Sequence, residues 1–126
     1  MRIAVFALLV AISIQCHAKC RKVEMAVTGR IEDTTGRAVA NAIVVVSFIE
    51  ARQARSELTR TRASGEYSLK FYWDPLSGGG PTRDRCEAKL HYVTVMAVAS
   101  GYETEEDQVA VVDRKAQSDL QLNKKR

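Results

Sequence analysis

The chain has little of what most active sites are built from, because its 126 residues include only two histidines and three cysteines. His17 and Cys16 lie in an N-terminal segment that we expect to be removed, which leaves His91 as the remaining imidazole. One histidine without a second at ligand spacing is usually structural rather than metal-bound. A Cys–His nucleophilic pair would need Cys86 as a free thiol near His91, and we expect that cysteine in a disulfide. The sequence therefore predicts no catalytic residue, no metal site and no cofactor, and it predicts that the protein is not an enzyme.

The chain also lacks a concentrated basic charge, and its acidic run at residues 103–107 is typical of a solvated face. The formal net charge is +4, and it falls to +3 if the N-terminal segment with Arg2 is lost. Basic residues alternate with acidic ones, and the single basic cluster is the terminal NKKR at residues 123–126, which is typical of a solvated end. Without a basic stripe on one face, we expect no nucleic-acid partner.

A long apolar run is absent except at the N-terminus. There Arg2 precedes an uncharged run from Ile3 to Ile14, and Ala18 supplies the small residue of a secretory cleavage site. The run is too short to anchor the protein across a bilayer. A buried N-terminal helix or strand is the alternative, and lipid attachment at Cys16 is disfavoured because Gln15 precedes it. We expect a signal peptide at residues 1–18, a mature domain at 19–126 without a transmembrane anchor, and a periplasmic or secreted, bacterial protein.

Cleavage after residue 18 leaves two cysteines, Cys20 and Cys86. In an oxidising compartment such a pair is expected to form one disulfide, and two separate buried thiols are the alternative.

Helical periodicity is hard to find beyond the N-terminal segment, whereas period-two alternation recurs. Seven segments read as strands: 25–31, 42–49, 57–63, 66–72, 91–99, 107–113 and 118–123. The β-branched run 42–49 is apolar on both faces, as in a central strand, and 57–63 carries the charged residues of an edge strand. Seven short strands separated by turn residues predict an all-β sandwich.

The link VTGRIEDTTGRAVANAIVVV, residues 27–46, connects two of these strands. Gly29 lies within a strand, where glycine indicates a bulge or a close backbone approach, and Gly36 is suited to a turn with positive φ. We expect the link to deliver Ala38, Val39 and Ala42 to the core.

The segment from Trp73 to Leu90 is a long loop that holds both prolines and three consecutive glycines. Long ordered loops are often functional, and aromatic and arginine side chains dominate many interfaces. Trp73 could instead close the open end of the core. The candidate partner-binding residues are Tyr72, Trp73, Asp74, Arg83 and Arg85, and the expected partner is another protein or an envelope glycan.

Three motifs in order resemble the carboxypeptidase regulatory-like domains, which are small transthyretin-like sandwiches. The motifs are the G-x-[IV]-x-D-x-x-G link, the T-x-T-x-x-x-G-x-Y-x-L hairpin and the A-x-G-Y corner. They fall on Gly29, Ile31, Asp33 and Gly36; on Thr59, Thr61, Gly65, Tyr67 and Leu69; and on Ala99, Gly101 and Tyr102. The hairpin of that family carries an aspartate where this chain has Arg62.

This resemblance implies a seven-stranded transthyretin-like (prealbumin-like) Greek-key sandwich. The fold includes a hydroxyisourate hydrolase that ends in Tyr-Arg-Gly-Ser, whereas this chain ends in QLNKKR, so that activity is not carried over. The sequence favours an exported, non-catalytic binding or protein-interaction module of the cell envelope. The alternative is a small exported inhibitor or immunity protein that neutralises a single enzyme or toxin.

Overall fold

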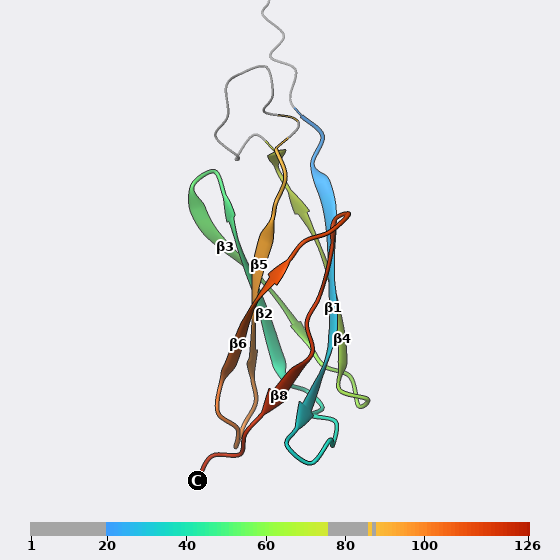
Figure 1. Cartoon of the computed structure of the whole chain (residues 1–126), viewed down its shortest axis with the longest axis vertical. Helices are drawn as coiled ribbons and strands as arrows, with labels where there is room; N and C mark the ends of the chain where they lie inside the picture. The colour runs from blue at the N-terminus through green and yellow to red at the C-terminus, as the bar shows by residue number, and fades with distance from the viewer. Residues whose placement is uncertain (1–19, 76–85, 87) are drawn as a thin grey trace, which may run out of the picture.

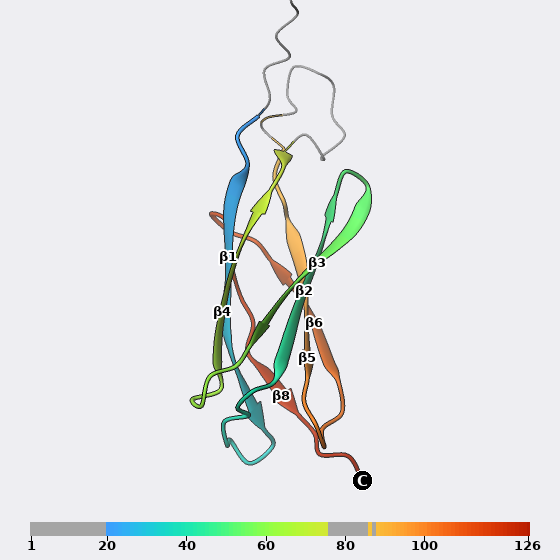
Figure 2. The same cartoon turned by 180° about the vertical axis from the view of Figure 1, so that it is seen from behind.

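The computed structural model describes residues 20–75, 86 and 88–126, and these form two four-stranded β-sheets packed face to face (Figures 1 and 2). The predicted all-β sandwich is confirmed at this level. The signal peptide predicted at 1–18 lies outside the described residues. The strands are β1 (Val23–Asp33), β2 (Ile43–Glu50), β3 (Gln53–Arg60), β4 (Glu66–Trp73), β5 (Tyr92–Val98), β6 (Glu105–Ala110), β7 (Lys115–Gln117) and β8 (Leu120–Leu122).

The first sheet is organised around β1, which is long enough to pair with three other strands. It runs antiparallel to β4, from the pair Val23 and Trp73 to the pair Arg30 and Glu66. On its other edge it pairs in parallel with β7 and then with β8. The other three strands of this sheet therefore all pair with β1.

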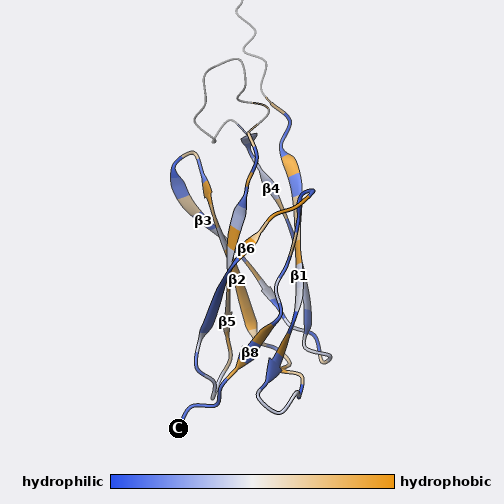
Figure 3. Ribbon diagram, in the orientation of Figure 1, coloured by the Kyte–Doolittle hydropathy of each residue, from blue (hydrophilic) through white to orange (hydrophobic). Residues whose placement is uncertain are grey.

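The second sheet is antiparallel throughout, in the order β3-β2-β5-β6. The predicted central strand is β2, which lies between two partners and carries strong hydrophobic colour in Figure 3. The predicted edge strand is β3, although it begins at Gln53 and ends at Arg60. The tight turn before it, at Ala51 and Arg52, is what sets its start, since both residues have positive φ.

The core lies between the two sheets and is made of alternate residues of the strands. Across it the rings of Phe48 and Phe71 stack with centroids 4.3 Å apart. The buried hydrophobic residues are Met25, Val27, Ile31, Val39, Ala42, Val44, Val46, Phe48, Tyr67, Phe71, Trp73, Leu90, Val93, Val95, Ala97, Ala116 and Leu122.

Gly29 lies where another part of the backbone approaches β1. A Cβ atom there would overlap the carbonyl oxygen of Ser118 and lie 2.6 Å from the Tyr67 hydroxyl. The expected close backbone approach is therefore confirmed, and its partner is the segment between β7 and β8.

The turn after β1 is held by Asp33, whose carboxylate accepts hydrogen bonds from the Thr35 hydroxyl and from the backbone N–H groups of Thr35 and Arg37. The Thr35 hydroxyl, chiefly, lowers the pKa of the Asp33 carboxyl. Gly36 has the expected positive φ, 82°. The prediction for Ala38 is wrong, because it is exposed and bridges Glu32 at the surface.

The described residues form eight strands rather than the predicted seven. The additional strand is β7, which is three residues long and pairs in parallel with β1. So short a strand shows no alternation that a sequence pattern could reveal. In the described part of the chain, no helix is long and apolar enough to cross a membrane.

Candidate functional site

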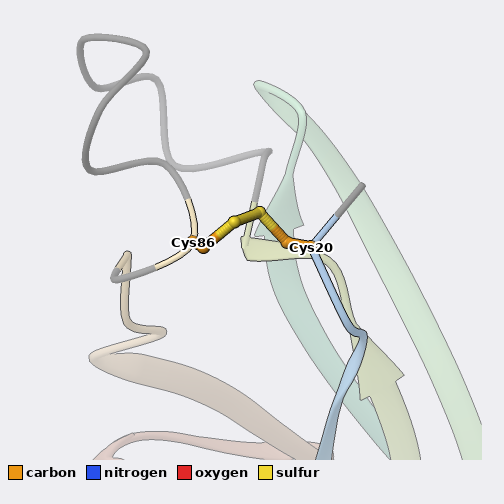
Figure 4. The surroundings of a disulfide bond; sticks show 2 residues. All are labelled: Cys20 and Cys86. Atoms are coloured by element: carbon orange, nitrogen blue, oxygen red, sulfur yellow. A yellow bond between two sulfur atoms is a disulfide. The ribbon is translucent and has the colours of Figure 1, made fainter. Parts of the chain in front are cut away.

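A disulfide between Cys20 and Cys86 ties the entry of β1 to the segment that precedes β5 (Figure 4). The two Cα atoms are 5.3 Å apart, and the bond joins residues 66 positions apart in sequence. The predicted pairing is therefore present in the structure. It holds together two segments that border a cavity at this end of the sandwich.

The cavity has a volume of about 740 Å³, within the range of small-molecule sites. It opens where the start of β1, the end of β4, the segment before β5 and the turn before β7 meet. Its lining residues are Val23, Met25, Trp73, Cys86, Ala88, Lys89, Leu90, His91, Val111, Asp113 and Arg114. We call it the disulfide-end pocket.

The floor of the disulfide-end pocket is apolar and fixed in place. Trp73 is 3% exposed, and its indole N–H donates a hydrogen bond of 3.0 Å to the carbonyl oxygen of Ile49 on the opposite sheet. Met25 and Leu90 are buried beside the same space. Because the tryptophan ring is anchored by both packing and a hydrogen bond, this wall is preorganised.

The rim of the pocket is polar and mainly basic. Lys89 and His91 come from the segment before β5, and Asp113 and Arg114 come from the turn before β7. All four are exposed. Asp113 and Arg114 both have positive φ, 51° and 64°, which is a conformation that residues with a Cβ atom rarely adopt. Their tight turn brings the Arg114 side chain to the rim.

The structure describes three of the five residues that the sequence grouped as a partner-binding set, Tyr72, Trp73 and Asp74. Trp73 lies in the core, whereas its neighbour Tyr72 is 58% exposed on the outer face of the first sheet. The backbone N–H of Asp74 donates to the Glu50 carboxylate at 3.0 Å. Arg83 and Arg85 lie outside the described residues.

Sequence reasoning missed Lys89, Asp113 and Arg114 as site residues. They belong to two segments that are far apart in the chain, and each alone reads as an ordinary surface charge. The pocket brings them together with His91, which the sequence analysis weighed only as a ligand or a nucleophile's partner. Cys86 also lines the pocket, but its sulfur is in the disulfide.

The described residues contain no group of three or more His, Cys, Asp or Glu side chains placed to hold a metal ion. Many non-haem iron sites use two histidines and a carboxylate, and His91 is the single histidine among the described residues. The described residues of this chain do not fit that ligand set.

No protein-family model and no curated protein matches the sequence. The structure resembles 3-chlorocatechol 1,2-dioxygenase from Rhodococcus opacus 1CP, with a TM-score of 0.57 and 13% identity over 83% of this chain and 61% of that one. It also resembles the L69A mutant of catechol 1,2-dioxygenase from Acinetobacter radioresistens, with a TM-score of 0.58 and 12% identity over 82% of this chain and 52% of that one. Hydroxyquinol 1,2-dioxygenase from Pseudomonas putida DLL-E4 gives 0.56 and 12%, over 83% and 58%.

These neighbours contradict the prediction of a non-catalytic module, its alternative of an inhibitor or immunity protein, and the prediction that the chain is not an enzyme. All of them are enzymes, and the chain shares their sandwich fold. At this identity the likeness is one of fold, and this chain spans only 52% to 61% of their length. A shared fold at this identity does not establish a shared reaction.

Proposed function

We propose that this chain is an enzyme-type sandwich domain whose disulfide-end pocket binds a small organic acid or phenolate with a single apolar ring. The observation that carries the proposal is the pocket's two-part lining. Buried Met25, Trp73 and Leu90 form an apolar floor, and Lys89 and Arg114 stand on an exposed basic rim.

An amphipathic ligand matches this lining. A planar ring on the floor gains from apolar burial and from contact with the Trp73 side chain. An acid group on the same ligand would face Lys89 and Arg114, and guanidinium binds carboxylates with two parallel hydrogen bonds. Asp113 lies on the same turn as Arg114 and would repel the acid group, so we expect that group to contact the guanidinium and the Lys89 ammonium rather than the carboxylate.

His91 stands on the same rim, and its imidazole can donate a hydrogen bond to, or accept one from, the hydroxyl or acid group of a bound ligand. The structural neighbours are named for catechol and hydroxyquinol, which are single-ring phenols of the size that this pocket admits. We derive no oxygenation step, because the described residues supply no matching metal ligands.

The single tryptophan of the chain makes the proposal directly testable. Titration with benzoate, catechol and hydroxyquinol should change Trp73 fluorescence, and cyclohexylamine, which carries the opposite charge, should not. Arg114→Gln should weaken binding of benzoate about tenfold, because it removes a charge-assisted contact. Arg62→Gln, on the hairpin before β4, is the matched control. Absence of any fluorescence change would reject the pocket as the binding site, and so would equal losses of benzoate affinity in the two variants. Absorbance spectra of the protein–ligand mixtures, recorded over time, would report turnover.

We also propose that the mature domain begins after Ala18 and is exported. The apolar run from Ile3 to Ile14 and the disulfide both support export, since disulfides persist mainly in oxidising compartments. The intact mass of the protein recovered from the producing cells tests this, because retention of residues 1–18 or two reduced thiols would count against it.

The resemblance to the carboxypeptidase regulatory-like, transthyretin-like sandwiches remains a proposal. Its support is that the motif glycines have structural roles: Gly29 admits a close backbone approach, and Gly36, Gly65 and Gly101 have positive φ. An experimental structure with a different strand connectivity would count against it.

A further inference from the structure

The two outward faces of the sandwich differ in chemistry. On the first sheet, alternate residues of β1 and β4 point outward, and charged residues predominate. Glu24 and Lys70 form an ion pair there at 3.7 Å, and Arg30 is paired in register with Glu66. This is an ordinary solvated face.

Nine of the fifteen outward side chains of the β3-β2-β5-β6 sheet are apolar, and one uncharged polar row, Ser56, Ser47, Thr94 and Gln108, crosses the sheet between them. One row runs across the whole sheet, with Leu58 beside Val45, Val45 beside Met96 and Met96 beside Glu106. Leu58 and Ile49 are 64% and 58% exposed. We call this surface the apolar face; its residues are Ile43, Val45, Ile49, Ala54, Leu58, Tyr92, Met96, Val98 and Ala110. Exposed apolar side chains gathered on one face of a sheet commonly mark an interaction site.

The charges of the apolar face lie at its two opposite edges. Among the outward residues of these four strands, the charged ones are Arg60 on β3 and Glu106 on β6. The Arg60 guanidinium lies 3.3 Å and 3.4 Å from the side-chain and backbone oxygens of Asn41, and Asn41 carries no charge to neutralise it. A basic edge and an acidic edge on one apolar surface make that surface self-complementary.

We propose that a second copy of this chain docks on the apolar face, related by a two-fold axis parallel to the strands. This operation places β3 of each copy over β6 of its partner, so that Arg60 approaches the partner's Glu106 at both ends of the interface. The proposal is independent of the disulfide-end pocket. Four strands about 4.8 Å apart and some six residues long offer roughly 20 by 20 Å of contact surface, which is at the small end of specific interfaces. We therefore expect a dimer with a dissociation constant in the micromolar range.

The test compares matched variants of the oxidised protein by sedimentation velocity, from low micromolar to near-millimolar concentration. Leu58→Glu should weaken dimerisation at least tenfold, because it buries a charge within the interface. Ser68→Glu, on the outward face of the first sheet, is the control and should leave dimerisation unchanged. Circular dichroism and Trp73 fluorescence verify that each variant is folded.

Charge exchange tests the geometry. Arg60→Glu and Glu106→Arg should each weaken the dimer, and the double variant should restore it, since the pair is then reversed. A double variant no tighter than the single ones would overturn the two-fold arrangement. A protein that stays monomeric over this concentration range would overturn the proposal. So would protection of the apolar face from hydrogen exchange in a monomer, which would mean that the chain's own residues cover it. A dimer that Leu58→Glu leaves unchanged would also overturn it.

Discussion

Replacing Tyr67 with phenylalanine should destabilise the protein at neutral pH and remove part of its sensitivity to alkali. Tyr67 is 1% exposed, and its hydroxyl donates a hydrogen bond of 2.6 Å to the carbonyl oxygen of Ser118. The substitution keeps the ring but leaves that carbonyl without this donor. A lost buried hydrogen bond of this kind costs about 1 to 2 kcal/mol.

The same hydroxyl couples stability to pH. Burial, above all, raises the pKa of Tyr67 to about 12 from an ordinary value of 10.0. Because the folded pKa is the higher one, the folded state favours the protonated phenol. Its contribution is complete below pH 10 and is lost as the pH rises toward 12, by on the order of 1 kcal/mol at pH 11 and about twice that at the end of the window.

The assay is urea unfolding of the wild-type protein and the variant at pH 7 and at pH 11. At pH 7 the variant should be less stable, and at pH 11 the difference should have shrunk by on the order of 1 kcal/mol. Other groups titrate in this window, but they are common to both proteins and cancel in the difference. Tyr72→Phe, at an exposed tyrosine, should change little at either pH. Parallel pH profiles for Tyr67→Phe and the wild type would refute the reasoning.

Three further predictions concern stability. Reduction of the Cys20–Cys86 disulfide should lower stability by about 4 kcal/mol in the loop-closure picture, and thermal melts with and without reductant measure it; unchanged melts would argue against it. Thr61→Val should cost about 2 kcal/mol, because its buried hydroxyl donates one backbone hydrogen bond and accepts another, at 2.7 and 2.8 Å; an equal cost for Thr61→Ser, which keeps the hydroxyl, would contradict this. Ala51→Asn and Arg52→Gly should each stabilise by up to about 1 kcal/mol, because both positions have positive φ; a lower urea midpoint would contradict this.

Part of the candidate site was readable from local pattern. The alternation in β4 that buries Tyr67 and Phe71 continues to Trp73, so period two alone places Trp73 in the core and Tyr72 on the opposite face. The two residues were predicted to be neighbours at the start of a loop. Consecutive side chains of a strand point to opposite faces of the sheet, and Tyr72 is accordingly exposed while Trp73 is buried. Removal of residues 1–18, as predicted, would leave a single pair of cysteines, and the structure joins that pair.

The sequence by itself determined the class of the fold, because alternation and β-branched runs are local properties that act within each strand. It determined the turn at Gly36 for the same reason, since glycine is suited to positive φ. Only the tertiary structure decided β7, whose three residues become a strand by pairing with β1. Only the tertiary structure brings Lys89 and Arg114 to one rim. Their proximity depends on which distant segments the two sheets place at the same end of the sandwich, and no local sequence pattern determines that.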